Sequence, residues 1–206
     1  MRPMTFAHRH LLDIERLSVD EINAILDRAE IYAEQIKSHA RKLDHFSGKT
    51  VVNLFFEPST RTRTSFELAA KRLGADVLNI SVEHSSTKKG ETLLDTVLNL
   101  DAMHIDALVI RHAESGVPAF IAPQMKAHVI NAGDGTNEHP TQALVDALTI
   151  RRHKKKLKDI TVAICGDIVH SRVARSNIQL LTKFGAKVRT VSPSYFATHN
   201  FDKLGV

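Results

Sequence analysis

The feature that most limits the fold of this chain is a short apolar run that passes at once into a helix start. Residues 51–56 have the composition of a strand buried on both faces, and Pro58 ends this run. A helix is expected from near Thr62, and Gly74 is its expected C-terminal stop. A doubly buried strand that is followed directly by a helix is typical of parallel sheets covered by helices.

The same alternation of apolar runs and helical periodicity continues along the chain. Further strands are expected at residues 75–80, 107–111, 128–131, 161–165 and 187–192. Further helices are expected at residues 92–103, 116–122, 139–152 and 171–184. An earlier helix begins at Ser18, because Glu21 three residues later completes a capping box. Strands separated by helices require right-handed crossovers, so the sequence predicts an α/β fold with a doubly wound parallel sheet.

A basic run at residues 151–158 divides the chain. Residues 1–152 are expected to form an N-terminal domain, and residues 153–206 the start of a second, Rossmann-like α/β domain. About 50 residues is short for an independent parallel domain, which needs several strands to bury its helices. The second domain is therefore expected to be incomplete within these residues.

The composition is that of a soluble globular protein, with 43% apolar and 25% charged residues. The longest apolar runs are far shorter than the roughly 20 residues of a membrane span. Cys165, the single cysteine, lies in an apolar run and is expected to be a core residue. The twelve histidines are scattered without an HExxH pair, so neither a metal nor a cofactor is expected. These features predict a cytoplasmic protein with no membrane partner.

The formal net charge of +5 brings a nucleic-acid partner into consideration. The densest basic run, residues 151–158, lacks the interleaved aromatic side chains that stack on bases. Cations also suit the C-terminal end of a helix. We therefore interpret this run as a solvated helix end and expect no nucleic-acid partner, whereas an anionic small substrate would also fit the positive charge.

Hydroxyl and guanidinium groups alternate where the residues 51–56 strand passes into its helix. Ser59, Thr60 and Thr62 supply hydroxyls, and Arg61 and Arg63 supply planar donor forks that match phosphate oxygens. Ligands of open parallel sheets bind beyond the carboxyl ends of strands, and a helix N-terminus attracts anions. The segment therefore predicts a phosphate site. The alternative is a capped helix start with two surface arginines.

Residues 55–67 resemble the carbamoyl-phosphate signature shared by aspartate and ornithine carbamoyltransferases. Residues 85–91 resemble a loop of the aspartate enzymes, and residues 110–112 and 131–142 match two further family segments. The order and spacing agree from about residue 10 to the end of the chain. Family catalytic chains are roughly 100 residues longer, with two domains of comparable size, so the resemblance is to a C-terminally incomplete chain.

The choice between the two transferases depends mainly on the loop at residues 85–91. Lys89 before Gly90 and Glu91, together with the run at residues 131–135, is similar to the aspartate family. The resemblance then implies transfer of the carbamoyl group of carbamoyl phosphate to the α-amine of L-aspartate, in pyrimidine biosynthesis. Alternatives are an ornithine carbamoyltransferase, a non-catalytic carbamoyl-phosphate-binding subunit, and a plain lysine-rich surface loop at Lys88 and Lys89.

The resemblance also implies roles for individual residues. Ser59, Thr60, Arg61 and Thr62 would hold the phosphate. Thr62, Arg111 and His139 would face the carbonyl oxygen, and Gln142 would meet the carbamoyl amide. We expect the positive helix end to lower the pKa of His139 and keep it neutral. The alternatives are a capping histidine for His139 and an edge salt bridge for Arg111.

Family catalytic units are trimers with shared active sites. By resemblance, Ser85 and Lys89 would reach into the site of a neighbouring subunit, and Lys89 and Arg172 would bind aspartate. A surface salt bridge is the alternative for Arg172. The catalytic set implied in this way is Arg61, Thr62, Arg111, His139 and Lys89. A regulatory chain or a dihydroorotase would be compatible partners.

Overall fold

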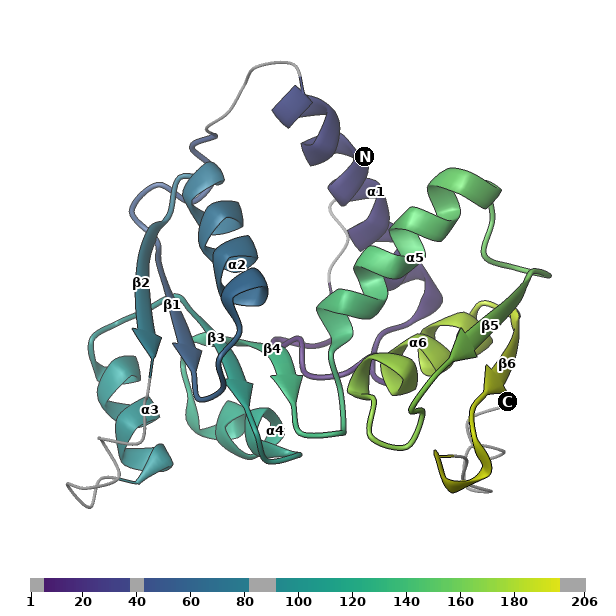
Figure 1. The fold of residues 1–206 in the computed structure, drawn as a ribbon. Helices are drawn as coiled ribbons and strands as arrows, with labels where there is room; N and C mark the ends of the chain where they lie inside the picture. Colours follow the sequence, from purple (N-terminus) through teal and green to yellow (C-terminus); the bar gives the residue numbers. More distant parts are fainter. Residues whose placement is uncertain (1–5, 38–42, 82–91, 197–206) are drawn as a thin grey trace.

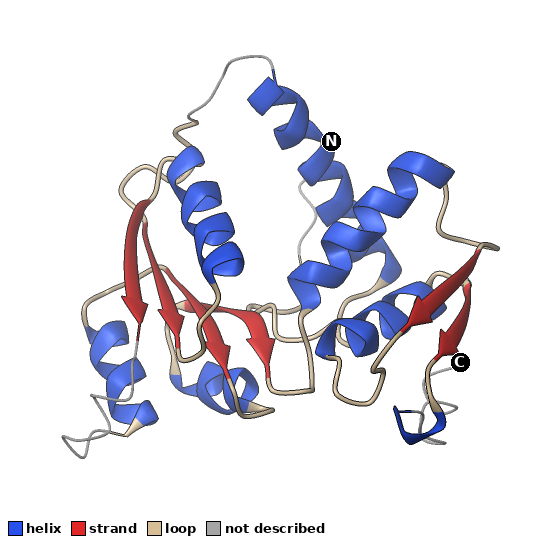
Figure 2. Cartoon of the chain, viewed as in Figure 1, coloured by secondary structure: helices blue, strands red, loops and turns tan. Residues whose placement is uncertain are grey.

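The computed structural model describes residues 6–37, 43–81 and 92–196. Its main sheet has four parallel strands in the order β2-β1-β3-β4 (Figures 1 and 2). These strands are β1 Thr50–Phe55, β2 Asp76–Ser81, β3 Ala107–His112 and β4 His128–Asp134. The connecting helices are α2 Thr60–Arg72, α3 Leu93–Ala102, α4 Val117–Ile121 and the short helix η2 Ala122–Gln124. The predicted doubly wound parallel α/β fold is confirmed.

Helices cover both faces of this sheet. On one face, Phe55 and Val109 lie in a buried cluster with Ala70 of α2. On the other face, Leu54 lies in a cluster with Val97 of α3 and with α4. The strands are therefore buried on both sides, which explains why their sequences read as continuous apolar runs.

The strand order places a topological switch point between β1 and β3. From β1 the chain crosses through α2 to β2 on one side, and from β3 it crosses through α4 to β4 on the other. Because α2 and α4 lie on opposite faces, the loops after β1 and β3 diverge at the carboxyl ends of these strands. This is the ordinary place for a ligand in an open parallel sheet.

A second parallel unit follows the main sheet. It contains α5 Pro140–Lys154, β5 Thr161–Cys165, α6 Arg172–Lys183, β6 Lys187–Val191 and the short helix η3 Ser194–Phe196. Strands β5 and β6 form a two-stranded parallel sheet. Helix α1, Val19–Lys37, packs across α5 and α6, because Ile22 and Leu26 lie in one buried cluster with Leu144 and Ile178. This cluster runs across residue 152, and the domain boundary drawn there stays a prediction.

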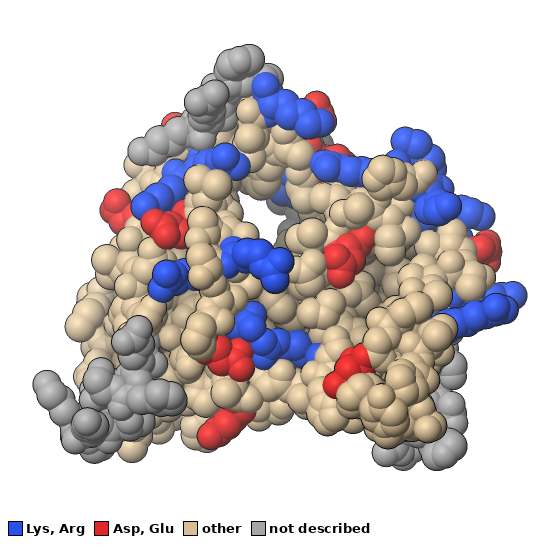
Figure 3. Space-filling view, viewed as in Figure 1, with Lys and Arg blue, Asp and Glu red and all other residues tan. Residues whose placement is uncertain are grey.

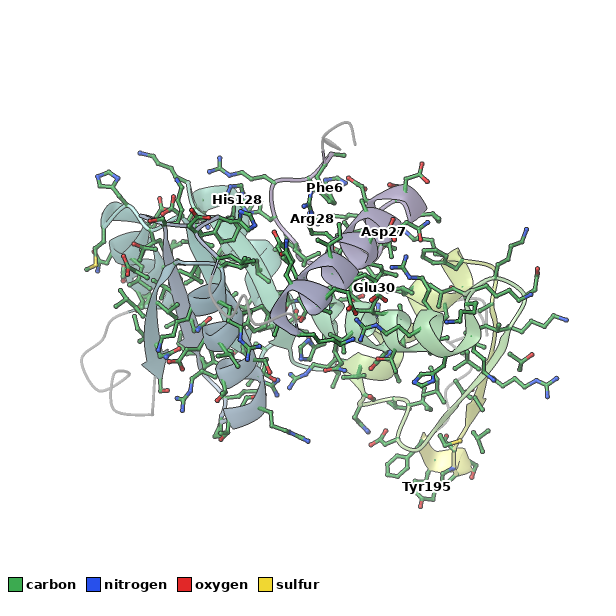
Figure 4. All side chains as sticks on the ribbon, turned by 90° about the horizontal axis from the view of Figure 1, so that it is seen from above. Phe6, Asp27, Arg28, Glu30, His128 and Tyr195 are labelled. Atoms are coloured by element: carbon green, nitrogen blue, oxygen red, sulfur yellow. The ribbon has the colours of Figure 1, made fainter. Side chains whose placement is uncertain are left out.

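Two ion pairs fasten α1 to the end of α5. Arg151 contacts Asp27 at 2.8 Å and Arg152 contacts Glu30 at 2.8 Å. In Figure 4, Asp27 and Glu30 lie along α1 on the side of α5. The lysines that follow are exposed while Leu157 is buried, which agrees with the predicted solvated helix end.

The predicted elements are present, with ends that move by at most three residues. The capping box is also confirmed, since the Glu21 backbone N–H donates to Ser18 Oγ at 3.1 Å and the Ser18 N–H donates to Glu21 Oε2 at 2.9 Å. The core prediction for Cys165 is wrong, because this side chain is exposed. Exposure alternates along β5, and its neighbour Ile164 packs into the cluster with α6 while Cys165 lies on the opposite face of the two-stranded sheet.

No helix among the described residues is long and apolar enough to cross a membrane.

Candidate active site

The predicted site residues that the structure describes lie at the carboxyl ends of β1 and β3, after β4, and at the starts of α2, α5 and α6. In the space-filling view, Lys and Arg atoms gather over the lower end of α2 and beside the end of β4, with acidic atoms next to them (Figure 3). This position coincides with the switch point between β1 and β3. The site is therefore built from several segments that are distant in sequence.

The N-terminus of α2 is open. Ser59 is the N-cap residue, yet its side chain makes no capping hydrogen bond. By contrast, the N-cap side chains Thr92 of α3 and Ser171 of α6 each accept a backbone N–H. No side-chain hydrogen bond joins Ser59, Thr60, Arg61 or Thr62 to another described residue, although Arg63 donates to Ser81 Oγ at 2.7 Å. The first N–H groups of α2 and these hydroxyls are thus available to an anion, which argues against a simple capped helix start.

Glu57 joins two arginines beside this helix start. Its Oε2 accepts from Arg111 Nε at 2.9 Å and from an Arg172 terminal nitrogen at 3.0 Å. The exposed fractions of the three side chains are only 26%, 14% and 15%, respectively. Arg172 also donates to the carbonyl of Gly135 at 3.0 Å. The salt bridges weighed as alternatives for both arginines do exist, but they lie within the site and hold two guanidinium groups near its centre.

His139 is buried at the start of α5, with 6% of its surface exposed. Its backbone N–H donates to Ser176 Oγ at 2.8 Å. Burial, followed by the charges of Arg111 and Arg172, lowers the pKa of His139 to about 4. The predicted direction of this pKa shift agrees, but its cause is burial beside two arginines. A neutral imidazole in this position can still donate a hydrogen bond to a developing oxyanion.

Gly133 allows these groups to approach one another. Its φ of +114° lies in a region that residues with a side chain rarely adopt. A Cβ at this position would be 3.1 Å from Arg172 Nε and 3.4 Å from His139 Cδ2. Glycine is therefore required both by the backbone conformation and by the space between the arginine and the imidazole.

Two acidic residues of the site were missed by sequence reasoning. Glu57 directly follows the β1 strand and precedes the basic segment, which is a signal that sequence alone offered. Glu138 is 2% exposed and accepts a hydrogen bond from the Ser176 hydroxyl. Burial raises the pKa of Glu138 to about 7, against the lowering effect of the Ser176 hydrogen bond. Only its position next to His139 could have drawn attention to it.

Gln142 lies in the first turn of α5 and donates from Nε2 to Asp146 Oδ1 at 2.9 Å. Ser85, Lys88 and Lys89, together with Gly90 and Glu91, lie outside the described residues. Among the residues that the structure does describe, no three His, Cys, Asp or Glu side chains gather in a way that could hold a metal ion.

An open helix N-terminus at the switch point of a parallel sheet, flanked by two half-buried arginines and a buried histidine, defines an α/β protein with a candidate site suited to an anion. A family model described as aspartate/ornithine carbamoyltransferase, carbamoyl-P binding domain, matches residues 9–152. The chain belongs to the aspartate/ornithine carbamoyltransferase family.

Relatives share both sequence and structure with the chain. The aspartate carbamoyltransferase catalytic subunit of Rhodospirillum centenum is 61% identical over 201 residues, which cover 98% of this chain and 63% of that protein. The corresponding subunit of Sorangium cellulosum is 64% identical over 188 residues, which cover 91% of this chain and 59% of that protein. The chain thus spans about three fifths of the length of these curated relatives.

Two solved structures have the same fold. The catalytic subunit of M. jannaschii aspartate transcarbamoylase matches with a TM-score of 0.88 at 35% identity, over 96% of this chain and 65% of that chain. Aspartate transcarbamoylase from Trypanosoma cruzi, in complex with carbamoyl phosphate and aspartate, also matches with a TM-score of 0.88 at 35% identity. That match covers 95% of this chain and 66% of the Trypanosoma cruzi chain.

Proposed function

We propose that this protein transfers the carbamoyl group of carbamoyl phosphate to the α-amine of L-aspartate, in pyrimidine biosynthesis. The amine attacks the carbonyl carbon to form a tetrahedral oxyanion. The bond from this carbon to the bridging oxygen then breaks, and phosphate leaves with the electron pair. The amine loses a proton, and the products are N-carbamoyl-L-aspartate and phosphate.

The observation that carries the proposal is the uncapped start of α2 next to the Arg111 and His139 pair. Ser59, Thr60, Arg61 and Thr62 are proposed to bind the phosphate, with Arg61 offsetting the charge that grows as phosphate leaves. The unpaired N–H groups of the helix end add a partial positive charge. The names of the relatives, which are aspartate carbamoyltransferases, support this assignment.

The carbonyl oxygen is proposed to receive hydrogen bonds from Thr62, Arg111 and His139. Support comes from the low pKa of His139, which leaves the imidazole neutral at the pH of the cell, so that it acts as a hydrogen-bond donor. Removing one such donor typically costs about 2.7–4 kcal/mol in the barrier. Gln142 is proposed to meet the carbamoyl amide.

The aspartate carboxylates are proposed to pair with Arg172 and with Lys89. Support for the role of Arg172 comes from its position beside Gly133 and from the Glu57 carboxylate that it shares with Arg111. Ser85 and Lys89 are proposed to come from a neighbouring subunit of a cytoplasmic homotrimer. Light scattering during size-exclusion chromatography tests the trimer, and a monomer at the concentration of the activity assay would contradict it.

The phosphate site is tested by calorimetry with inorganic phosphate and carbamoyl phosphate. Arg61→Ala is expected to weaken both affinities at least about tenfold, because a charge-assisted hydrogen bond contributes about 1.5–3 kcal/mol. Arg72→Ala is the matched control, since it removes the same charge from the last turn of the same helix. Equal losses in the two variants would mean that net charge alone binds the anion.

The acceptor is tested by offering L-aspartate and L-ornithine separately with carbamoyl phosphate and identifying the products. N-carbamoyl-L-aspartate is the expected product. Citrulline would contradict the assignment to aspartate. Binding of carbamoyl phosphate without turnover of either amino acid would instead favour a non-catalytic carbamoyl-phosphate-binding subunit.

A further inference from the structure

The side-chain amide of Gln142 is held in one orientation by groups that the proposed reaction does not use. We propose that Asp146, itself held by Asn177, turns the Oε1 atom of Gln142 toward the ligand and so selects a ligand with an amino group on its carbonyl carbon. This inference rests on the proposed function, because it assigns an atom of the same site.

Gln142 and Asp146 lie one turn apart on α5, so their side chains share a face of the helix. Gln142 Nε2 lies 2.9 Å from Asp146 Oδ1. The backbone N–H of Gln142 donates to the His139 carbonyl at 3.0 Å, which places Gln142 in the first turn, next to the buried imidazole. The Gln142 amide is therefore near the start of α5, and Asp146 lies one turn further from this start.

The chemistry of the partners decides which end of the amide faces the site. A carboxylate has no proton to donate, so it can only accept from the Nε2 end of Gln142. Within the described part of the chain, Gln142 Oε1 makes no hydrogen bond. Because Gln142 is only partly buried, this oxygen remains accessible as an acceptor.

Asp146 cannot turn freely, because Asn177 of α6 holds its second oxygen. Asn177 Nδ2 donates to Asp146 Oδ2 at 2.7 Å and to the Val173 carbonyl at 3.1 Å. Both of these acceptors lack protons, so the Asn177 amide also has one favoured orientation. Asn177 is 8% exposed, which keeps competing water away from most of it. The result is a directed relay that runs from the Val173 carbonyl through Asn177 and Asp146 to Gln142.

The relay has a consequence for ligand choice. Carbamoyl phosphate and acetyl phosphate share a phosphate and a carbonyl, and they differ by an amino group in place of a methyl group. A fixed Oε1 accepts from the amino group and has nothing to accept from the methyl group. If the amide of Gln142 were reversed, two N–H donors would face each other and the preference would disappear.

Asp146→Asn tests the relay with almost no change in size. The new amide has one oxygen, and the donor Nδ2 of Asn177 competes for it because its own position is fixed by Val173. The N–H end of residue 146 then faces Gln142. The Gln142 amide must reverse, so that its Oε1 accepts from residue 146 and its N–H end faces the ligand. Asp27→Asn is the matched control. Asp27 of α1 also pairs with a side chain of α5, but this partner, Arg151, lies near the opposite end of α5 from Gln142.

Calorimetry gives the dissociation constants of carbamoyl phosphate, acetyl phosphate and inorganic phosphate for each variant. The parent and Asp27→Asn are expected to prefer carbamoyl phosphate over acetyl phosphate about fivefold, the factor for one hydrogen bond of about 1 kcal/mol. In Asp146→Asn this ratio is expected to fall to about one, with the affinity for inorganic phosphate unchanged. Asp146→Glu, which keeps an acceptor without protons, is expected to restore part of the preference.

The outcomes separate this inference from the proposed function. Failure of the parent to bind phosphate and carbamoyl phosphate would refute the function and the relay together. If the parent binds all three ligands but does not prefer carbamoyl phosphate over acetyl phosphate, the relay alone is overturned. The same holds if the parent has this preference and Asp146→Asn keeps it unchanged. Parallel loss of all three affinities in Asp146→Asn would show a merely structural role and would also overturn it.

A second variant and a spectroscopic signal guard against misfolding of Asp146→Asn. Gln142→Met removes the acceptor while leaving Asp146 intact, and it is expected to bring the ratio to about one. The NMR signals of the Gln142 side-chain amide, which this variant identifies by their loss, are expected to shift in Asp146→Asn without any ligand. An unchanged ratio in Gln142→Met, or unshifted amide signals in a folded Asp146→Asn, would refute the proposal.

Discussion

Two buried neighbours, Glu138 and His139, should impose opposite pH dependences on stability. The pKa of Glu138 is raised from 4.5 to about 7, so the folded state holds a proton that the unfolded state releases between these values. Its contribution to stability is complete below pH 4.5 and is lost as the pH rises through 7. The pKa of His139 is lowered from 6.5 to about 4, so its contribution is complete above pH 6.5 and is lost as the pH falls through 4.

Each shift of about 2.5 pKa units corresponds to about 3 kcal/mol, at about 1.36 kcal/mol per unit. As the pH rises from 4.5 to 6.5, the stabilising contribution of Glu138 falls while that of His139 rises, so the two changes cancel in the parent. Glu138→Gln keeps an acceptor for the Ser176 hydroxyl and removes the proton uptake. The free energy of unfolding of the variant minus that of the parent should therefore increase by about 3 kcal/mol as the pH rises from 4.5 to 7.5.

Urea denaturation of both proteins at four pH values between 4.5 and 7.5 measures this difference in the free energy of unfolding. All other groups titrate in both proteins and cancel when the two are subtracted. Glu34→Gln, at an exposed pair with Lys37, should follow the parent in parallel. A difference between Glu138→Gln and the parent that stays constant within about 0.5 kcal/mol over this range would refute the reasoning.

Three other substitutions probe separate parts of the structure. Gly133→Ala forces a residue with a side chain into a left-handed backbone conformation and places its Cβ 3.1 Å from Arg172 Nε. The variant should lose about 1–3 kcal/mol of unfolding free energy in urea. It should also bind phosphate more weakly in calorimetry. Ser18→Ala removes the capping box and should cost about 1 kcal/mol while phosphate affinity stays the same; a change in that affinity would contradict the separation of α1 from the site. Glu57→Gln leaves Arg111 and Arg172 without their shared carboxylate and should cost about 2 kcal/mol, and added phosphate should raise its melting temperature more than that of the parent.

Local sequence patterns were sufficient to predict the elements that position the site. Short apolar runs become strands when both faces are covered, and the pattern at residues 51–56 follows directly from the clusters on the two sides of β1. A helix start near Thr62 followed from Pro58 and from the apolar spacing after it, and the observed start at Thr60 lies two residues earlier. Arg111 and His139 could be identified because each lies at the end or start of such an element, although their roles came from a family resemblance.

Partners from distant segments could not be predicted in the same way. Glu57 and Arg172 are 115 residues apart, and Ser176 and Glu138 are 38 residues apart. The exposure of Cys165 depends on whether a layer covers the outer face of the two-stranded sheet, which its own apolar neighbours do not reveal. Burial of this kind depends on how the elements pack. It is also the main cause of the low pKa of His139, for which the sequence had suggested the positive end of the helix.

The contacts of α6 show that the β5–α6–β6 unit takes part in shaping the candidate site. Arg172 and Ser176 lie four residues apart and so project from one face of α6, with Asn177 beside them. From this face Arg172 contacts Glu57, Ser176 contacts the backbone of His139, and Asn177 contacts Asp146. A change in the position of α6 would therefore move an arginine, an imidazole and an amide of the site together. We infer that the start of α5 has its observed geometry because α6 packs against it, so that the two units act as parts of one site.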